Sequence, residues 1–495
     1  MLRYDCLLRG GRVLDPANAR DGLYDIGILH GRIEAVEPEL EPASAAIVFD
    51  MTGKWVMPGH MDTHVHVSSS LQASTTDHED EPCLPPAYQT DPALGYRMMA
   101  EAGVTTAIDF AGTMPSIIDG IKRRGAGLNI AGLHVLAPGA TIPHHDPSRT
   151  ALRDALREGL TQGSLGLKIL GGHYPLTPDA TARAIAVCNE ATAYVALHCG
   201  TTASSSTLDG LREVPQLVGD GRLHIAHVDA YCRGLVREPI DECQEALSML
   251  SGMKRQLVSE VKFGIPNACS GRCDGADVSD HIVHNCLRAR GYPITRDGLR
   301  QALLDGYASV IAAHRERVQL FTREDGLELW EAAGSNVMVS FPVNNPASAF
   351  TLTTAKDAAG EFIVDAVSTD GGCIPRNIAV KRTWALVDME ALTALEMASK
   401  LSWNPARMFG FTRKGHLSPG ADADITAVHA ETGTPVFGMV AGQPIMRDGH
   451  ALGRGGTLLV THWGETTARE SGLDYRIVDL SETKLYADWS SSYRE

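Results

Sequence analysis

Residues 57–67 read MPGHMDTHVHV, an apolar stretch that carries two histidines two positions apart. A β-strand points residues i and i+2 to the same side, so the imidazoles of His64 and His66 can share one metal ion. The chain has 19 histidines, and an H-x-H pair can also arise by chance on a surface loop. Whether His64 and His66 bind a metal must therefore be judged from the flanking sequence and from other candidate ligands further along the chain.

Short apolar segments alternate with helical patterns from Val56 onward. These segments are TTAIDF at 105–110, NIAGLHVLA at 129–137, SLGLKIL at 164–170, YVALHCG at 194–200 and LHIAHVD at 223–229, followed by QLVSEVKF at 256–263 and FIVDAVSTD at 362–370. Strand ends recur about every 25–35 residues over the regular part, as in repeated βα units. The sequence predicts an α/β fold, a TIM-like (β/α)8 barrel over residues 56–410.

The rest of the chain follows other patterns. Residues 1–55 and 411–495 contain short β-like stretches broken by glycine, and we expect both ends to form one small β-sandwich, with a C-terminal tail. About a hundred residues separate the seventh and eighth predicted strands, too many for a simple loop. We expect residues 264–361 to form an inserted helical subdomain over the barrel mouth, because LRQALLDGYASVIAAHRERVQLF has a helical pattern.

Composition excludes several classes of protein. The hydrophobic fraction of 44% and the charged fraction of 21% are ordinary for a globular protein. No segment has the roughly 18 consecutive apolar residues of a membrane span, and the N-terminus lacks a secretory pattern, so cytoplasmic residence without a membrane partner is expected. A net charge of −16 opposes binding to a phosphate backbone, which argues against nucleic acid. The ten cysteines form no C-x-x-C pair.

Four further polar residues lie near the C-terminal ends of predicted strands, where barrel enzymes place catalytic groups. They are Lys168, His198, His227 and Asp370. Each alone could be a packing, ion-pair or turn residue, and His224 competes with His227. Burial would lower the pKa of a lysine, and a neutral amine can add carbon dioxide to become a carbamate with two oxygen ligands.

The run PGHMDTHVH resembles the signature of the amidohydrolase superfamily, in which such a segment ends the first barrel strand. GVTTAIDF at 103–110 is similar to the second strand of the binuclear hydantoinase, dihydropyrimidinase and dihydroorotase branch. NPARMFGF and KGHLSPGADADITAV resemble the closing motifs of the superfamily. The resemblance implies two divalent metal ions, most simply zinc, with Lys168 carbamylated as the bridge. The implied ligands are His64, His66, Lys168, His198, His227 and Asp370.

The implied reaction is hydrolysis of a non-peptide carbon–nitrogen bond. Metal ions would lower the pKa of a bound water to give hydroxide, and Asp370 would carry the proton to the departing nitrogen. We expect a small-molecule cyclic amide substrate, such as a hydantoin, dihydropyrimidine or imide, and a homo-oligomeric enzyme. Residues that could contact the substrate are Arg233, Arg272, Arg376 and His173.

Two alternatives stay open. The insertion is similar to that of N-acyl-D-amino-acid deacylases, so hydrolysis of an N-acyl or N-carbamoyl amino acid is one of them. Those deacylases lack the lysine at the place of Lys168, and acidic residues follow their H-x-H, where this chain has Val67, Ser68 and Ser69. The other is a non-catalytic scaffold of the same fold, which the filled ligand positions oppose.

Overall fold

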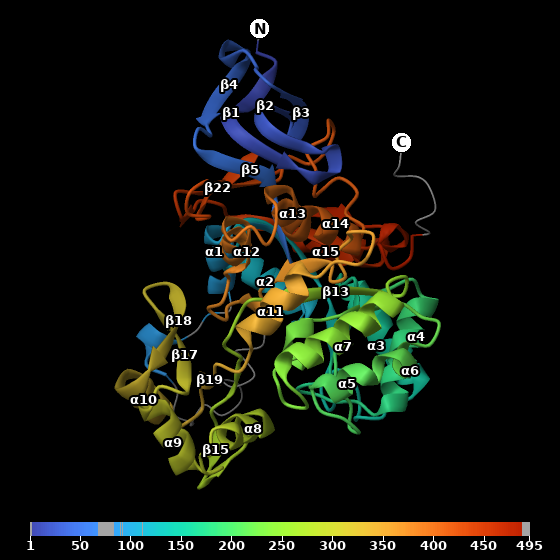
Figure 1. The fold of residues 1–495 in the computed structure, drawn as a ribbon, viewed down its shortest axis with the longest axis vertical. Coiled ribbons are helices and arrows are strands. Elements are labelled where there is room, and N and C mark those ends of the chain that lie inside the picture. Colours follow the sequence, from blue (N-terminus) through green and yellow to red (C-terminus); the bar gives the residue numbers. More distant parts are fainter. Residues whose placement is uncertain (1, 68–83, 90, 92, 111, 488–495) are drawn as a thin grey trace.

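Strands from both ends of the chain form one sheet in the computed structural model (Figure 1). The structure describes residues 2–67, 84–89, 91, 93–110 and 112–487. The sheet has the order β25-β24-β23-β22-β5-β1-β2-β3, and β4 pairs with β1. Its strands are β1 (Tyr4–Asp15), β2 (Arg20–Leu29), β3 (Arg32–Glu37), β4 (Ala45–Asp50), β5 (Lys54–Pro58), β22 (Ile425–His429), β23 (Pro435–Val440), β24 (Gln443–Arg447) and β25 (His450–Ala451).

The middle of the chain forms parallel sheets whose strands follow the predicted segments closely. In one sheet, β6 (His60–His66) lies between β7 (Val104–Asp109) and the short β21 (Gly371–Gly372), and β8 (Ala126–Gly132) pairs with β7. The other has the order β20-β13-β12-β11-β10-β9. Its strands are β9 (His134–Leu136), β10 (Gly166–Leu170), β11 (Tyr194–His198), β12 (Leu223–Ile225), β13 (Leu257–Lys262) and β20 (Ala366–Ser368). This confirms an α/β fold built on parallel strands.

These strands are almost entirely buried, as expected for parallel strands covered on both faces. Every residue of β6, β7 and β13 is buried. The covering helices in this part of the chain are α1 (Leu94–Glu101), α2 (Met114–Arg124), α3 (Arg149–Gln162), α4 (Pro178–Glu190), α5 (Leu208–Arg212), α6 (Val214–Val218), α7 (Pro239–Gly252), α12 (Ala379–Asp388), α13 (Ala394–Ala398) and α14 (Asn404–Phe409).

Local sequence explains where the covering helices begin and end. The hydroxyl of Ser148 caps α3 by accepting from the N–H of Ala151, and Gly163 ends that helix with φ of 109°. Thr177 caps α4 in the same way, with a proline at the first helical position. The buried faces of α3 and α4 pack into one core with the apolar side chains of β10 and β11.

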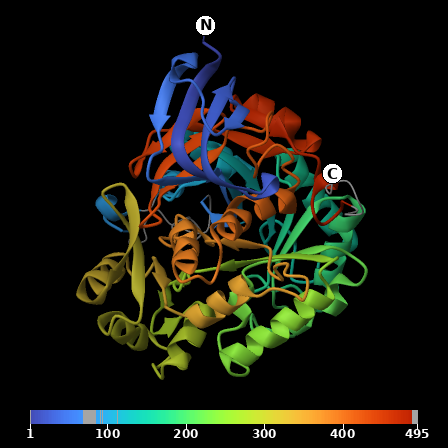
Figure 2. The same cartoon turned by 45° about the horizontal axis from the view of Figure 1, so that its top comes forward.

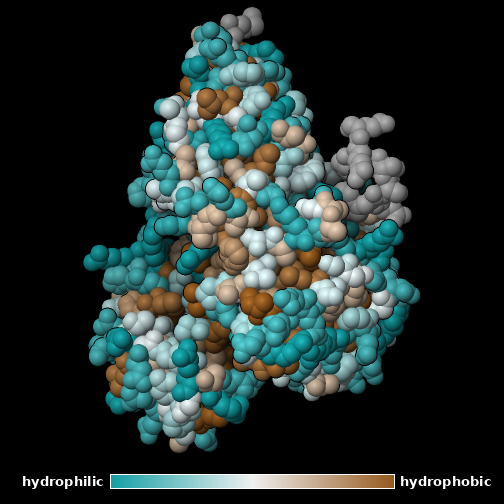
Figure 3. All heavy atoms as spheres, in the orientation of Figure 1, coloured by the Kyte–Doolittle hydropathy of each residue, from teal (hydrophilic) through white to brown (hydrophobic). Residues whose placement is uncertain are grey.

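Most of the insertion at 264–361 forms a separate lobe, seen in yellow in Figures 1 and 2. Its last helix, α11 (Pro346–Thr354), instead packs against α7 and β13, and Ala349 and Leu352 join the core of the parallel strands. The expectation that this insertion is helical is only partly correct, because β17, β18, β14 and β19 form a four-stranded sheet. The elements are β14 (Cys269–Ser270), β15 (Cys273–Asp274), β16 (Asp277–Val278), α8 (His281–Ala289), α9 (Arg296–Leu304), β17 (Ser309–His314), β18 (Arg317–Thr322), α10 (Arg323–Ala332), β19 (Met338–Ser340) and α11 (Pro346–Thr354). Figure 3 shows apolar side chains where the lobe meets the rest of the molecule.

The expectation that residues 411–495 contribute only to the sandwich and a tail is partly wrong, because the end of the chain adds two strands to the first parallel sheet. β26 (Gly455–Val460) pairs with β8, and β27 (Asp474–Ile477) pairs with β26. Between them, α15 (Glu465–Ser471) lies near β27. Among the helices that the structure describes, none has the length and apolar character to cross a membrane.

Candidate metal centre

His64 and His66 meet Asp370 at the C-terminal end of β6. The Nε2 atom of His66 lies 2.6 Å from Oδ1 of Asp370, and Nε2 of His64 lies 3.4 Å from the same oxygen. One ligand atom from each of the three side chains lies within 4.8 Å of the other two. The backbone N–H of Asp370, which follows β20, donates to the carbonyl of His64 at 2.9 Å. The gap between β20 and β21 therefore brings this carboxylate to the two histidines.

His227 and His198 extend the cluster along neighbouring strands. The His227 ring stacks on the His64 ring at 5.0 Å between centroids, and the His198 ring meets the His227 ring edge-on at 4.5 Å. His227 follows β12 with a left-handed φ of 34°, and a short 3-10 helix begins at the next residue. Nε2 of His198 is within 2.6 Å of the Ser206 hydroxyl. The structure thus brings four histidines together in one place.

His224, the competitor of His227, has other partners. Its Nδ1 lies 3.0 Å from the Tyr194 hydroxyl, and its Nε2 hydrogen-bonds Glu260. Both ring nitrogens of His224 are thus hydrogen-bonded to buried side chains, whereas Nδ1 of His227 makes no hydrogen bond to any described residue. This difference favours His227 as the residue that can bind a metal.

Lys168 is completely buried on β10 and is joined to the cluster through Phe110. Its Nζ lies 4.6 Å from the centroid of the Phe110 ring, which is itself 4.3 Å from the His64 ring. Burial lowers the pKa of the Lys168 ammonium to about 8. The amine is therefore shifted toward its neutral, nucleophilic form.

Three imidazoles of the cluster, those of His64, His198 and His227, are held neutral by burial. Burial lowers the pKa of His64 to about 3 and lowers those of His198 and His227 well below the usual value. A neutral imidazole offers the lone pair that a metal ion needs. These three side chains can therefore bind a metal ion at neutral pH without first losing a proton.

Unsatisfied buried atoms supply the fit to a metal. Among the predicted ligands, four buried side-chain nitrogens have no hydrogen-bond partner in the described part of the chain: Nε2 of His64, Nδ1 of His66, Nδ1 of His227 and Nζ of Lys168. Buried polar atoms are normally paired, and an unpaired one costs free energy. Nitrogen donors beside a carboxylate match the preferences of zinc and similar divalent ions, so the residues fit the implied group.

Sequence reasoning missed three charged residues of the site. Glu260 and Lys262 are two positions apart on β13, and both are buried. Nζ of Lys262 lies 2.5 Å from Oδ2 of Asp370. Asp229 accepts from the backbone N–H of Lys262 at 2.9 Å, and burial raises the pKa of this carboxyl to about 7. The sequence did carry a signal for Glu260 and Lys262, because both are charged residues inside the apolar segment LVSEVK. A buried strand rarely carries charged residues unless they have partners.

The four predicted substrate contacts lie at different distances from this chemistry. Arg376 is buried, and its Nη2 lies 2.7 Å from Oδ2 of Asp370 while its Nε donates to the Asp370 carbonyl. The His173 ring is 6.1 Å from the His198 ring. Arg233 donates to the side chain of Asn344 at 3.0 Å. Arg272 pairs with Asp274, and 42% of its side chain is exposed.

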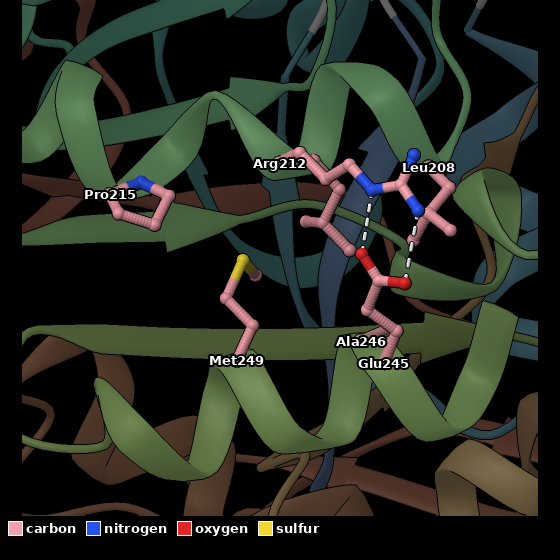
Figure 4. A pocket seen from close by; sticks show the side chains of 7 residues that line it. Leu208, Arg212, Pro215, Glu245, Ala246 and Met249 are labelled. Atoms are coloured by element: carbon pink, nitrogen blue, oxygen red, sulfur yellow. Dashed lines mark hydrogen bonds and ion pairs between the residues drawn. The ribbon is translucent and has the colours of Figure 1, made fainter.

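A surface pocket elsewhere has a different character (Figure 4). It lies between α5, α6 and α7 and is lined by Leu208, Leu211, Arg212, Pro215, Glu245, Ala246 and Met249. Arg212 and Glu245 form a two-pronged ion pair across it, at 2.6 and 3.0 Å. No titratable group here is free for chemistry among these lining residues, so the histidine cluster is the better candidate site.

The chain matches the sequence model of one protein family. Residues 55–445 match the model of the amidohydrolase family. The dihydroorotase of Elusimicrobium minutum (strain Pei191) is 24% identical over 437 residues, which cover 85% of this chain and 87% of that protein.

Two solved structures illustrate the likeness of fold. The N-acyl-D-glutamate deacylase of Bordetella bronchiseptica, complexed with zinc and a phosphonate inhibitor, has a TM-score of 0.62 at 15% identity and covers 92% of this chain and 98% of its own. A D-hydantoinase has a TM-score of 0.56 at 15% identity, with the same coverage of 92% and 98%. The metal ligands predicted above all lie inside the matched region.

Proposed function

Because the chain belongs to the amidohydrolase family, we propose that it is a metal-dependent hydrolase that opens a cyclic amide related to hydantoin, dihydropyrimidine or dihydroorotate. The observation that carries this proposal is the group of His64, His66 and Asp370, whose ligand atoms lie within 4.8 Å of one another. The likeness to a dihydroorotase and to a D-hydantoinase supports a ring substrate.

Two divalent ions, most simply zinc, are proposed for this centre. His64, His66 and Asp370 would hold one ion, and His198 and His227 the other. When bound, such ions activate water and polarise the amide carbonyl. Lys168 would bridge them as a carbamate, which its buried and unpaired Nζ supports. The zinc in the deacylase structure is consistent with this choice of ion.

Asp370 is proposed to handle the proton. Its Oδ1 faces the two histidines, and its Oδ2 faces Lys262 and Arg376. The carboxylate is 5% exposed, so water has little access to it except through the site. In this position it can accept a proton from the attacking water and pass it to the departing ring nitrogen.

The positive side of the site is proposed to bind an acidic group on the substrate. Lys262 and Arg376 both reach Asp370, and Arg233 lies at the same end of the strands, after β12. A planar guanidinium can grip a carboxylate with two parallel hydrogen bonds. His173, beside His198, is a further contact. The exposed Arg272, paired with Asp274, has the weakest support of the four predicted residues.

Deacylation of an N-acyl amino acid is the second candidate. The fold likeness to the N-acyl-D-glutamate deacylase and the lobe at 264–361 favour it. Dihydroorotate and N-acyl amino acids both carry a carboxylate, so the cationic residues do not separate a dihydroorotate-like ring from a linear substrate. Lys168 favours the cyclic amide, because the resembling deacylases lack a lysine at this place.

The test is a substrate panel. Purified protein, reconstituted with zinc and bicarbonate, is assayed against dihydroorotate, hydantoins, cyclic imides, N-carbamoyl amino acids and N-acyl amino acids. Hydrolysis of the cyclic compounds but not of the N-carbamoyl and N-acyl amino acids supports the first proposal. Hydrolysis of the N-acyl or N-carbamoyl amino acids but not of the cyclic compounds supports the deacylase. Protein that holds zinc but turns over neither class would instead indicate the scaffold alternative.

Three structural features go with this function as proposals. The parallel strands are proposed to close into a (β/α)8 barrel over about residues 56–410, since β21 pairs with β6 and since the solved relatives share the fold. The nine strands from both chain ends that share one sheet are proposed as the accompanying sandwich domain, without β26 and β27, which pair with the parallel strands. Residues 264–361 are proposed as the insertion. Homo-oligomerisation and cytoplasmic residence also remain predictions, and light scattering of the purified protein would check the former.

A further inference from the structure

Glu260 is a buried carboxylate beneath the histidine cluster, and its side chain is completely inaccessible to solvent. Its Oε1 accepts from Nδ1–H of His64 at 2.9 Å and from the backbone N–H of His227 at 2.9 Å. Its Oε2 accepts from Nε2–H of His224. One side chain thus reaches two predicted ligands and the histidine that competes with one of them.

These contacts fix the form of the His64 ring. An ionised carboxylate only accepts hydrogen bonds, so the His64 nitrogen that faces Glu260 must carry the proton. The other nitrogen, Nε2, then keeps its lone pair and points toward Asp370 at 3.4 Å. In metal sites, a carboxylate that holds the far nitrogen of a ligand histidine selects the tautomer and orients the ring.

His224 and Tyr194 hold Glu260 in turn. The Tyr194 hydroxyl lies 3.0 Å from Nδ1 of His224, and all three side chains are buried. A carboxylate held by several donors inside the protein has little freedom to turn. This chain of contacts also explains why His224 lies three residues from His227 without facing the cluster.

We propose that Glu260 is a positioning residue of the metal centre, which holds His64 in the Nδ1–H tautomer and ties the His227 backbone to it, with His224 as its anchor. This inference rests on the metal site proposed above, but not on the substrate. It assigns the charged residue of β13 a role in metal retention.

The test substitutes Glu260 and a matched buried glutamate. In Glu260→Gln, one acceptor oxygen becomes an NH2 donor and the negative charge is lost, so the side chain can no longer accept from His64, the His227 backbone and His224 together. The hold on the His64 ring is therefore weakened. Glu242 is equally buried, and its hydrogen bonds among the described residues come from the backbone N–H groups of Gly234, Val236 and Arg237, at 2.7, 2.7 and 3.0 Å. Glu242→Gln therefore reports loss of a buried carboxylate without any change at a histidine.

The readouts are zinc affinity, measured by competition with a chelator, and the melting temperature of metal-free protein. We expect Glu260→Gln to bind zinc about 10- to 100-fold more weakly, and Glu242→Gln to bind it like the unmodified chain. Unchanged zinc affinity in Glu260→Gln, or an equal loss in both variants, would overturn the assignment. Failure of the unmodified chain to bind zinc would instead reject the proposed function.

A second measurement needs no variant at Glu260, in case that protein does not fold. Nitrogen-15 NMR of histidine-labelled, metal-free protein distinguishes the two imidazole tautomers, and comparison with His64→Asn identifies the signal of His64. We expect the proton of His64 on Nδ1. A proton on Nε2 would show that Glu260 does not set the tautomer.

Discussion

Lys168 decides whether the proposed centre can hold two metal ions or only one. We expect Lys168→Ala to lose the bridging group, so that metal analysis finds one ion or none per chain where the unmodified protein holds about two, and hydrolysis falls at least about 100-fold. Lys400 is the matched control, since it is also fully buried and donates to the Val364 carbonyl. Lys400→Met should alter stability but leave the metal content unchanged. A Lys168→Ala enzyme with two metals would rule out the carbamate.

Single residues differ in how far the sequence alone could place them. His64 and His66 share a strand and are two residues apart, so the sequence alone predicts that their side chains point to the same side. Lys168, His198 and His227 each lie near the C-terminal end of a predicted strand, which places them at the same edge of the sheet. Glu260 was beyond reach, because its partners His64 and His224 are 196 and 36 residues away. Only the packing of β13 between β12 and β20 shows that its carboxylate lies under the cluster.

Among the elements, the hairpin of β17 and β18 is the one that sequence periodicity assigned wrongly. Short apolar runs such as SVIAAH do not separate a buried strand from a buried helix by periodicity alone. The turn also lacks its usual signal. Arg315 and Glu316 adopt φ of 50° and 63°, the conformation that a two-residue hairpin normally gives to Asn-Gly. Sequence patterns can therefore miss a hairpin whose turn residues are unusual, when pairing with a third strand, here β19, stabilises it.

That turn offers a prediction for the element. Replacing Arg315 and Glu316 by Asn and Gly should stabilise the hairpin by about 1 kcal/mol, because glycine adopts a positive φ without the steric cost that other residues bear. The substitution removes the Arg97–Glu316 ion pair, but this pair is exposed and contributes little. Hydrogen exchange of the β17 and β18 amides should slow. An Ala-Ala replacement is the control and should give no such protection, and equal protection in both would contradict the explanation.

At the scale of the whole molecule, the site depends on strands that are far apart in the chain. The predicted ligands come from β6, β10, β11, the end of β12 and the segment after β20. The lobe at 264–361 enters between β13 and β20, next to the strand that carries Glu260 and Lys262. The sequence predicts the alternation of strands and helices, because each unit is local. It does not predict that β26 returns to pair with β8, since nothing near residue 455 specifies that partner.

Metal removal should therefore lower the stability of the whole fold. An ion bound to the native state but not to the unfolded chain stabilises by mass action, by about 2.7 kcal/mol when its free concentration is 100 times Kd. We expect chelation to lower the melting temperature by several degrees and zinc to restore it. His66→Asn should abolish most of this response, because Nε2 of His66 lies 2.6 Å from Asp370 in the cluster. His144 is exposed and outside the cluster, so His144→Asn should respond like the unmodified protein. If chelation and zinc shifted the melting temperature of His66→Asn as much as that of the unmodified protein, the stabilising metal would bind at a site other than this cluster.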